Sequence, residues 1–103
     1  MSIVRHEHTN RLAELIPFGR EAAISRKALA EALAMSDRKA RAAVEDARRD
    51  GLIIINSQNG QGYFQTIDPD EMLRQYRQDT ARALAIFRRR EPLREALIAA
   101  GVT

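Results

Sequence analysis

The chain has 103 residues, no cysteine, and 17 Lys and Arg residues against 14 Asp and Glu, which gives a formal charge of +3 at pH 7. Without cysteine it has no disulfides and no thiolate zinc ligands. Since no apolar run approaches the roughly 18 residues of a membrane span, we expect a soluble cytoplasmic protein with no membrane partner. Fifteen of the 17 cations are arginines, which bind phosphates and guanine edges bidentately, so the composition permits nucleic-acid binding without establishing it.

The N-terminal third starts with a segment that has no hydrophobic period. Residues 1–9 are therefore predicted to be flexible. A short helix is expected over about 10–16, where leucine and isoleucine recur at helical spacing, and Pro17 ends it because the residue before a proline avoids the helical conformation. Residues 18–23 are predicted to form a loop.

Two capped helices follow with almost no loop between them. Ser25 and Ser36 are each placed to accept a hydrogen bond from an unpaired amide in the first turn of the helix that follows. The second helix is expected to run to about Asp50, where Gly51 can supply a left-handed C-terminal cap. Its apolar residues recur at helical spacing: Ala40, Ala43, Val44 and Ala47. Two such helices must turn sharply against each other, which predicts helix-turn-helix geometry.

The hydrophobic period then changes to that of strands. The β-branched run 52–55 and the segment 63–67 predict a hairpin around the polar loop 56–62. Tyr63 and Phe64 are interpreted as packing residues, one facing the core and one facing away, because side chains alternate along a strand.

A long helix is predicted after the hairpin. Asp68 is expected to cap it, with Glu71 completing a capping-box-like arrangement, and the helix should continue to about Arg90. Pro92 marks a break, and residues 93–100 are predicted to form a last short helix.

This order of elements predicts a mainly α fold with a small β-hairpin. We expect a winged helix-turn-helix, a three-helix core plus a wing, over residues 10–67. It is flanked by the flexible segment 1–9 and by a C-terminal helical extension, 68–103, that is a possible dimerisation element.

The same residues resemble a known family. Residues 24–36 (ISRKALAEALAMS) look like the approach to the turn in winged-helix repressor domains, and residues 37–52 (DRKARAAVEDARRDGL) look like their recognition helix. Residues 60–64 (GQGYF) are similar to the wing of the biotin-operon-repressor type. The resemblance implies duplex DNA binding, as in small regulators of transcription carried by phages and mobile elements. Ala47 departs from the pattern, which has a larger aliphatic there, so we expect a thinner core or one filled by another helix.

The helix after Ser36 supplies the base-contact candidates. Four residues lie opposite or beside the apolar positions of this helix, and their side chains match base edges in the major groove: Arg38, Arg41, Ala42 and Glu45. The alternative is a solvated face on which Glu45 pairs with Arg41 or Arg49 at a spacing of four residues, and pairing is the role we favour for Glu45.

Other residues are candidates for contacts that position the duplex. The phosphate candidates are cations and one helix cap: Arg26, Lys27, Ser36, Lys39 and Arg49. The wing candidates are Asn59, Gly60 and Gln61, which have no cation and should bind weakly through amides.

The long helix predicts a homodimer. Its apolar and small residues recur at steps of three and four, which suits pairing with a second copy: Leu73, Tyr76, Thr80, Ala83, Leu84 and Phe87. The alternative is that the helix only covers its own domain.

No catalytic, metal or cofactor constellation can be assembled from the residues, so no enzyme activity is expected. Sequence-specific double-stranded DNA binding by a transcriptional regulator is the predicted function. The alternative is a winged-helix protein-interaction module, such as a replication or phage accessory factor, without sequence-specific DNA binding. Whether a small-molecule effector exists stays open.

Overall fold

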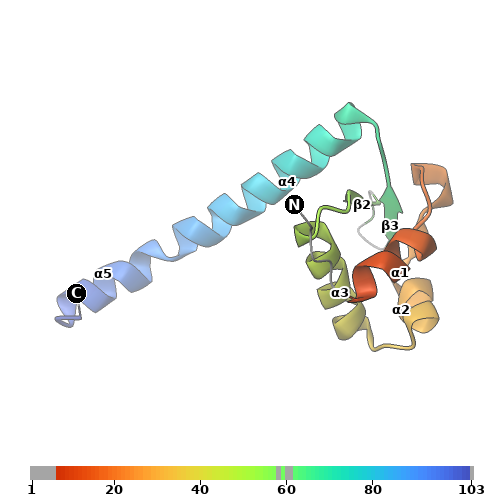
Figure 1. The fold of residues 1–103 in the computed structure, drawn as a ribbon. Coiled ribbons are helices and arrows are strands. Elements are labelled where there is room, and N and C mark those ends of the chain that lie inside the picture. The colour runs from red at the N-terminus through yellow and green to blue at the C-terminus, as the bar shows by residue number, and fades with distance from the viewer. Residues whose placement is uncertain (1–6, 58, 60–61, 103) are drawn as a thin grey trace, which may run out of the picture. The chain divides into compact units, whose positions relative to one another are not determined.

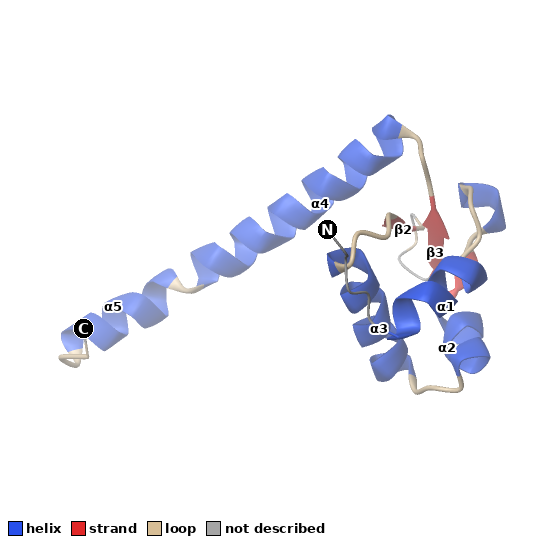
Figure 2. Cartoon of the chain, viewed as in Figure 1, coloured by secondary structure: helices blue, strands red, loops and turns tan. Residues whose placement is uncertain are grey.

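The computed structural model describes residues 7–57, 59 and 62–102 and is mainly helical, with a small three-stranded antiparallel sheet and a long C-terminal helix (Figures 1 and 2). This confirms the predicted mainly α class, the small β element and the long helix. The chain divides into two compact units, Met1–Met72 and Leu73–Thr103, here called unit 1 and unit 2.

Helix α1 (Glu7–Leu15) begins earlier than predicted, so the flexible segment expected over residues 1–9 is wrong for residues 7–9. Residues 1–6 of that segment lie outside the described residues. The reason is tertiary: Thr9 is fully buried, and its hydroxyl donates a 2.6 Å hydrogen bond to Asp50 Oδ2 at the end of α3. Leu12 on the same helix and Ile16 just after it are buried in the core.

The segment after Pro17, predicted as a loop, contains a short 3-10 helix, η1 (Arg20–Ala22). It leads into a strand that the sequence did not indicate, β1 (Ile24–Ser25). A two-residue strand is too short to show a hydrophobic period, and it exists because it pairs with β3 far along the chain. Gly62 allows this pairing, since a Cβ at that position would lie 2.8 Å from the carbonyl oxygen of Ile24.

Helices α2 (Arg26–Leu33) and α3 (Asp37–Arg49) have the predicted caps. Ser25 Oγ and Ser36 Oγ each accept a hydrogen bond from the amide three residues on, at 3.0 and 3.2 Å. Residues 34–36 connect the helices, and Ala34 adopts a left-handed conformation with φ 55° that turns the chain sharply. The two helices therefore form the predicted sharp turn.

The core of unit 1 lies between α1, α2, α3 and the inner face of the sheet. Its buried members are mostly small on α3 and larger on the other elements: Leu12, Ile16, Leu29, Ala30, Leu33, Ala40, Ala43, Val44, Ala47, Ile54 and Tyr63. Ala47 is fully buried, and α1 packs against α3. The small side chains of α3 let the neighbouring helices approach closely, so the expectation that another helix fills the space is consistent with the packing.

Strands β2 (Ile54–Asn56) and β3 (Gly62–Gln65) pair antiparallel, with β3 in the middle of the order β1-β3-β2. Both are shorter or shifted relative to the predicted 52–55 and 63–67. Leu52 cannot start the strand because its amide donates to the Ala47 carbonyl at the end of α3, 3.0 Å away. Thr66 cannot extend β3 because its hydroxyl takes part in the capping of α4.

The expectation that one of Tyr63 and Phe64 faces away from the protein interior is wrong. Both side chains are buried, and every residue of β3 is buried as well. The middle strand of a three-stranded sheet has neighbours on both edges, and here both of its faces are covered.

Helix α4 (Pro69–Arg89) begins as predicted, but its cap differs from a capping box. Asp68 Oδ1 accepts from the amide of Asp70 at 3.0 Å. Glu71 does not reach back to the amide of Asp68, because Thr66 lies between them: its hydroxyl accepts from that amide at 2.9 Å and donates to Glu71 at 2.7 Å.

The last helix is α5 (Glu91–Ala99), which follows α4 after a turn at Arg90. Gly101, with φ 81°, follows the end of the helical segment. Within the part of the chain that the structure describes, no helix combines the length and the apolar content that crossing a membrane requires.

Candidate nucleic-acid interface

The outward face of α3 presents all of the predicted base-contact residues to solvent. Each of them is exposed, while the opposite side of the helix is buried in the core: Arg38, Arg41, Ala42 and Glu45. The exposure follows from the helical period, because these positions lie opposite or beside the alanine and valine side chains that face α1 and α2.

One carboxylate joins the start of α3 to α2. Asp37 Oδ2 accepts from Arg26 Nη2 and from Arg41 Nε, each at 3.1 Å. The three side chains are one-third to about half exposed, so the contacts are weak in energy and easily exchanged for other anions. Arg26 Nε is buried and lacks a hydrogen-bond partner among the described residues. The first turns of α2 and α3 thus bring two guanidinium groups to one point.

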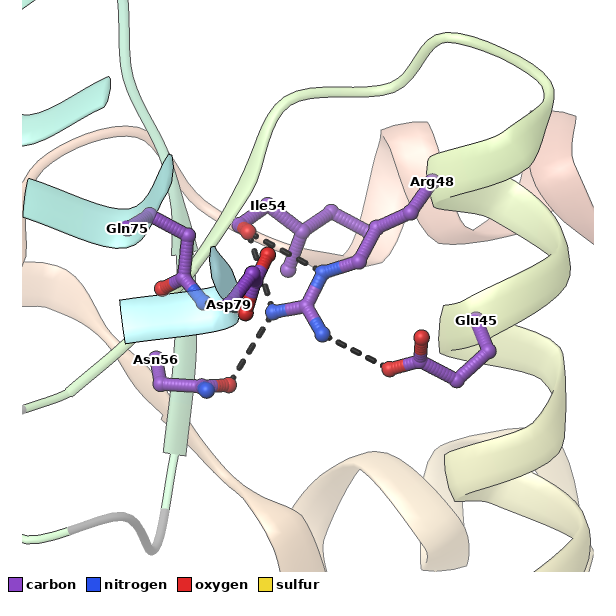
Figure 3. Close-up of polar contacts among 6 residues, drawn as sticks. All are labelled: Glu45, Arg48, Ile54, Asn56, Gln75 and Asp79. Atoms are coloured by element: carbon purple, nitrogen blue, oxygen red, sulfur yellow. Dashed lines mark hydrogen bonds and ion pairs between the residues drawn. The ribbon is translucent and has the colours of Figure 1, made fainter. Parts of the chain in front are cut away.

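Arg48 has a structural role that the sequence did not reveal (Figure 3). Its guanidinium donates to the carbonyl oxygen of Ile54 at 3.0 and 3.2 Å, to Asn56 Oδ1 at 3.0 Å and to Glu45 Oε1 at 2.7 Å. It therefore ties the last turn of α3 to β2. Its position at the edge of the apolar face, one turn before the strand, is the signal that could have identified it.

The prediction that Glu45 pairs with Arg41 or Arg49 is wrong, because the partner of Glu45 is another arginine. Glu45 pairs with Arg48, Arg41 pairs with Asp37, and Arg49 pairs with Asp46. Spacings of three and four residues both bring side chains together on a helix, so spacing alone could not choose between them. Glu45 does take the pairing role that we favoured.

The phosphate candidates lie at the two helix starts and along α3. Lys27, Lys39 and Arg49 are exposed, and Ser36 is engaged as the cap of α3. A hollow of about 510 Å³ lies at the starts of α2 and α3, with a lining that includes Ser25, Arg26, Lys27, Met35 and Asp37. Helix amides and cations at the rim of a concave surface are suited to positioning a phosphate.

The predicted wing is described only in part. Gly60 and Gln61 lie outside the described residues. Asn59 is exposed, and its Oδ1 accepts a hydrogen bond from Ser57 Oγ at 2.9 Å. At the base of this loop, the amide of Ser57 donates a 2.9 Å hydrogen bond to the carbonyl oxygen of Gly62.

Tyr63 lies on β3, the middle strand of the sheet, and is buried. Burial raises the pKa of its hydroxyl above the ordinary value near 10, although the positive charges of Arg26 and Arg48 act in the opposite direction. The hydroxyl therefore stays neutral at physiological pH.

The six dimer candidates lie together on α4. All of them are exposed in the single chain: Leu73, Tyr76, Thr80, Ala83, Leu84 and Phe87. Their common exposure leaves them accessible to a second chain.

Acidic and imidazole side chains do not gather into a metal-binding group anywhere in residues 7–57, 59 and 62–102. Comparisons were made with protein-family models, curated proteins and solved structures. None of them matches this chain.

Proposed function

We propose that this protein binds double-stranded DNA sequence-specifically through α3 and acts as a regulator of transcription, without catalysis or a cofactor. The observation that carries the proposal is the exposed outward face of α3, with Arg38 and Arg41 in its first two turns. The helix order, the tight turn between α2 and α3 and the antiparallel sheet support a winged helix-turn-helix.

The dimensions and chemistry of the helix suit a major groove. The groove is about 12 Å wide and admits one α-helix, whose N-terminal turns approach the base edges. Arg38 and Arg41 can each donate two hydrogen bonds to a guanine, and the small side chain of Ala42 on the same exposed face allows close approach and contact with a thymine methyl.

The positive charges at the helix starts suit the flanking phosphates. Arg26 and Lys27 open α2, and Ser36 caps α3, so cations and helix amides lie at the starts of both helices, and Asp37 links Arg26 to the base-contact candidate Arg41. When a phosphate replaces the Asp37 carboxylate beside Arg26, the exchange preserves a charge-assisted contact while placing the duplex in register.

Selection from random duplexes tests the proposal. We expect one enriched motif, bound about a thousandfold or more tightly than unrelated duplex, with an affinity that falls steeply as salt rises. No enrichment, with only weak and salt-sensitive background binding, would refute the proposal and favour a protein-interaction module.

Asp37→Asn is expected to strengthen binding to any duplex by about fivefold at 0.15 M salt. The change frees Arg26 and Arg41 from their shared carboxylate, and one more uncompensated positive charge steepens the logarithmic salt dependence by about 0.9. Titration of labelled duplex at several salt concentrations measures both effects. The variant should lose no more than about 1 kcal/mol of stability, because the contacts are partly exposed.

Glu91→Gln is the matched control, because it removes the same charge from an exposed ion pair, Glu91 with Arg94, on α5. It should leave the slope unchanged. Equal affinities of Asp37→Asn and the original protein for duplex would show that Asp37 does not compete with phosphate.

A further inference from the structure

Helix α4 exposes a continuous apolar strip, which we call the α4 seam and define as Leu73, Tyr76, Thr80, Ala83 and Phe87. Its three large side chains are 44%, 69% and 56% exposed for Leu73, Tyr76 and Phe87. The members recur at steps of three and four, which places them along one side of the helix. Most of the stability of a helix in a protein comes from the packing of its apolar side, so an exposed apolar strip of this kind is suited to a partner.

Two contacts, one within α4 and one from Arg90 just after it, involve residues of the seam. Thr80 Oγ1 donates to the carbonyl oxygen of Tyr76 at 2.9 Å, so the hydroxyl is already satisfied and the methyl group can face an apolar partner. The guanidinium of Arg90 lies 4.8 Å from the centre of the Phe87 ring and stacks on it as a cation. The Phe87 end of the seam therefore lies beside a cation, and the middle of the seam, at Thr80 and Ala83, has small side chains.

The charges of the helix differ between its halves. Residues 69–80 contain three carboxylates and two arginines, while residues 81–94 contain five arginines and one carboxylate. Parallel pairing of two copies would place the arginine-rich halves side by side, where like charges repel. Antiparallel pairing separates them and sets each against the acidic half of the other copy.

We infer that the partner of the α4 seam is a second copy of this chain, bound antiparallel through α4. The occupant is identified by this charge pattern, because the helix complements itself only when it is reversed. The inference concerns unit 2 and does not depend on DNA binding.

The seam defines the register. When the seams of two copies are aligned in opposite directions, Tyr76 lies against Phe87 of the second copy, and Thr80 lies against Ala83 of the second copy. The aromatic pair flanks a centre of small side chains that allows the helix axes to approach closely. Leu73 then lies opposite Arg90, while the two Leu73 residues are separated by about 25 Å along the axis.

The absence of cysteine makes the direction of pairing measurable. Leu73→Cys and Arg90→Cys are made as two separate variants of the 103-residue chain. Three samples are then oxidised: each variant alone and a mixture of the two. A disulfide needs Cα atoms within about 7 Å. We expect a covalent dimer in the mixture and none with either variant alone. Dimers with each variant alone would mean parallel pairing and overturn the inference, as would the absence of dimer in all three samples.

Sedimentation of the unmodified chain gives an independent readout. Tyr76→Glu should produce a monomer, because it places a charge in the seam, whereas Gln78→Glu adds the same charge on the outer side of α4 and should leave the dimer intact. A monomeric original protein, or equal sedimentation of the two variants, would contradict the inference even if both variants retain their helical circular dichroism.

Discussion

Replacing Arg38 and Arg41 together by alanine is expected to weaken binding to the selected duplex about 100-fold. Each bidentate arginine contact to a guanine contributes roughly 1–3 kcal/mol of discrimination, and the loss of two such contacts at about 1.4 kcal/mol each gives this factor. Affinity for unrelated duplex should fall much less, so the ratio of specific to non-specific binding should shrink. Titration of both duplexes under one salt condition measures the ratio.

The matched control removes two exposed arginines of unit 1 that are not on α3. Arg11 lies on α1 and Arg20 on η1, so Arg11→Ala with Arg20→Ala subtracts the same charge. This control should weaken both duplexes by a similar small factor and preserve the preference. A double variant of Arg38 and Arg41 that is folded and still prefers the selected sequence would exclude α3 as the element that recognises bases.

Leu29→Ala is expected to have the largest effect on stability, roughly 2–5 kcal/mol. Leu29 is fully buried between α2 and the rest of the core. Alanine favours helix, so the loss comes from lost contacts and the cavity, not from helix propensity. The core of unit 1 has few large side chains, because four of its members are alanines, so a cavity there is difficult to fill. Urea unfolding followed by circular dichroism measures the change.

Leu93→Ala is the control for this substitution. Leu93 is 68% exposed on α5, so the same change there should alter the free energy of unfolding by no more than about 0.5 kcal/mol. Similar losses at both positions would mean that the α2 contacts do not determine the stability of unit 1. The total stability of a protein is about 5–15 kcal/mol, so a loss of this size is a large share of it. Because α3 packs against α2, we expect Leu29→Ala also to weaken duplex binding.

Local chemistry made much of the fold predictable. Ser25, Ser36 and Gly51 act within one turn of their own helices, so their roles follow from neighbouring residues alone. The exposure of Arg38 and Arg41 follows equally from the period of α3. Strand limits were less accurate, because Leu52 and Thr66 make contacts with helix ends that a period-two pattern does not contain.

The sequence by itself determined the starts of α2, α3 and α4, the outward side of α3 and the exposed strip of α4, since each depends on residues along one helix. Only the tertiary structure decided which cations of the candidate interface are engaged. Asp37 joins Arg26 to Arg41, and Arg48 ties α3 to the carbonyl of Ile54, through contacts between separate elements. Long side chains choose among several partners within reach, and the choice depends on how the backbones pack, which no local pattern encodes.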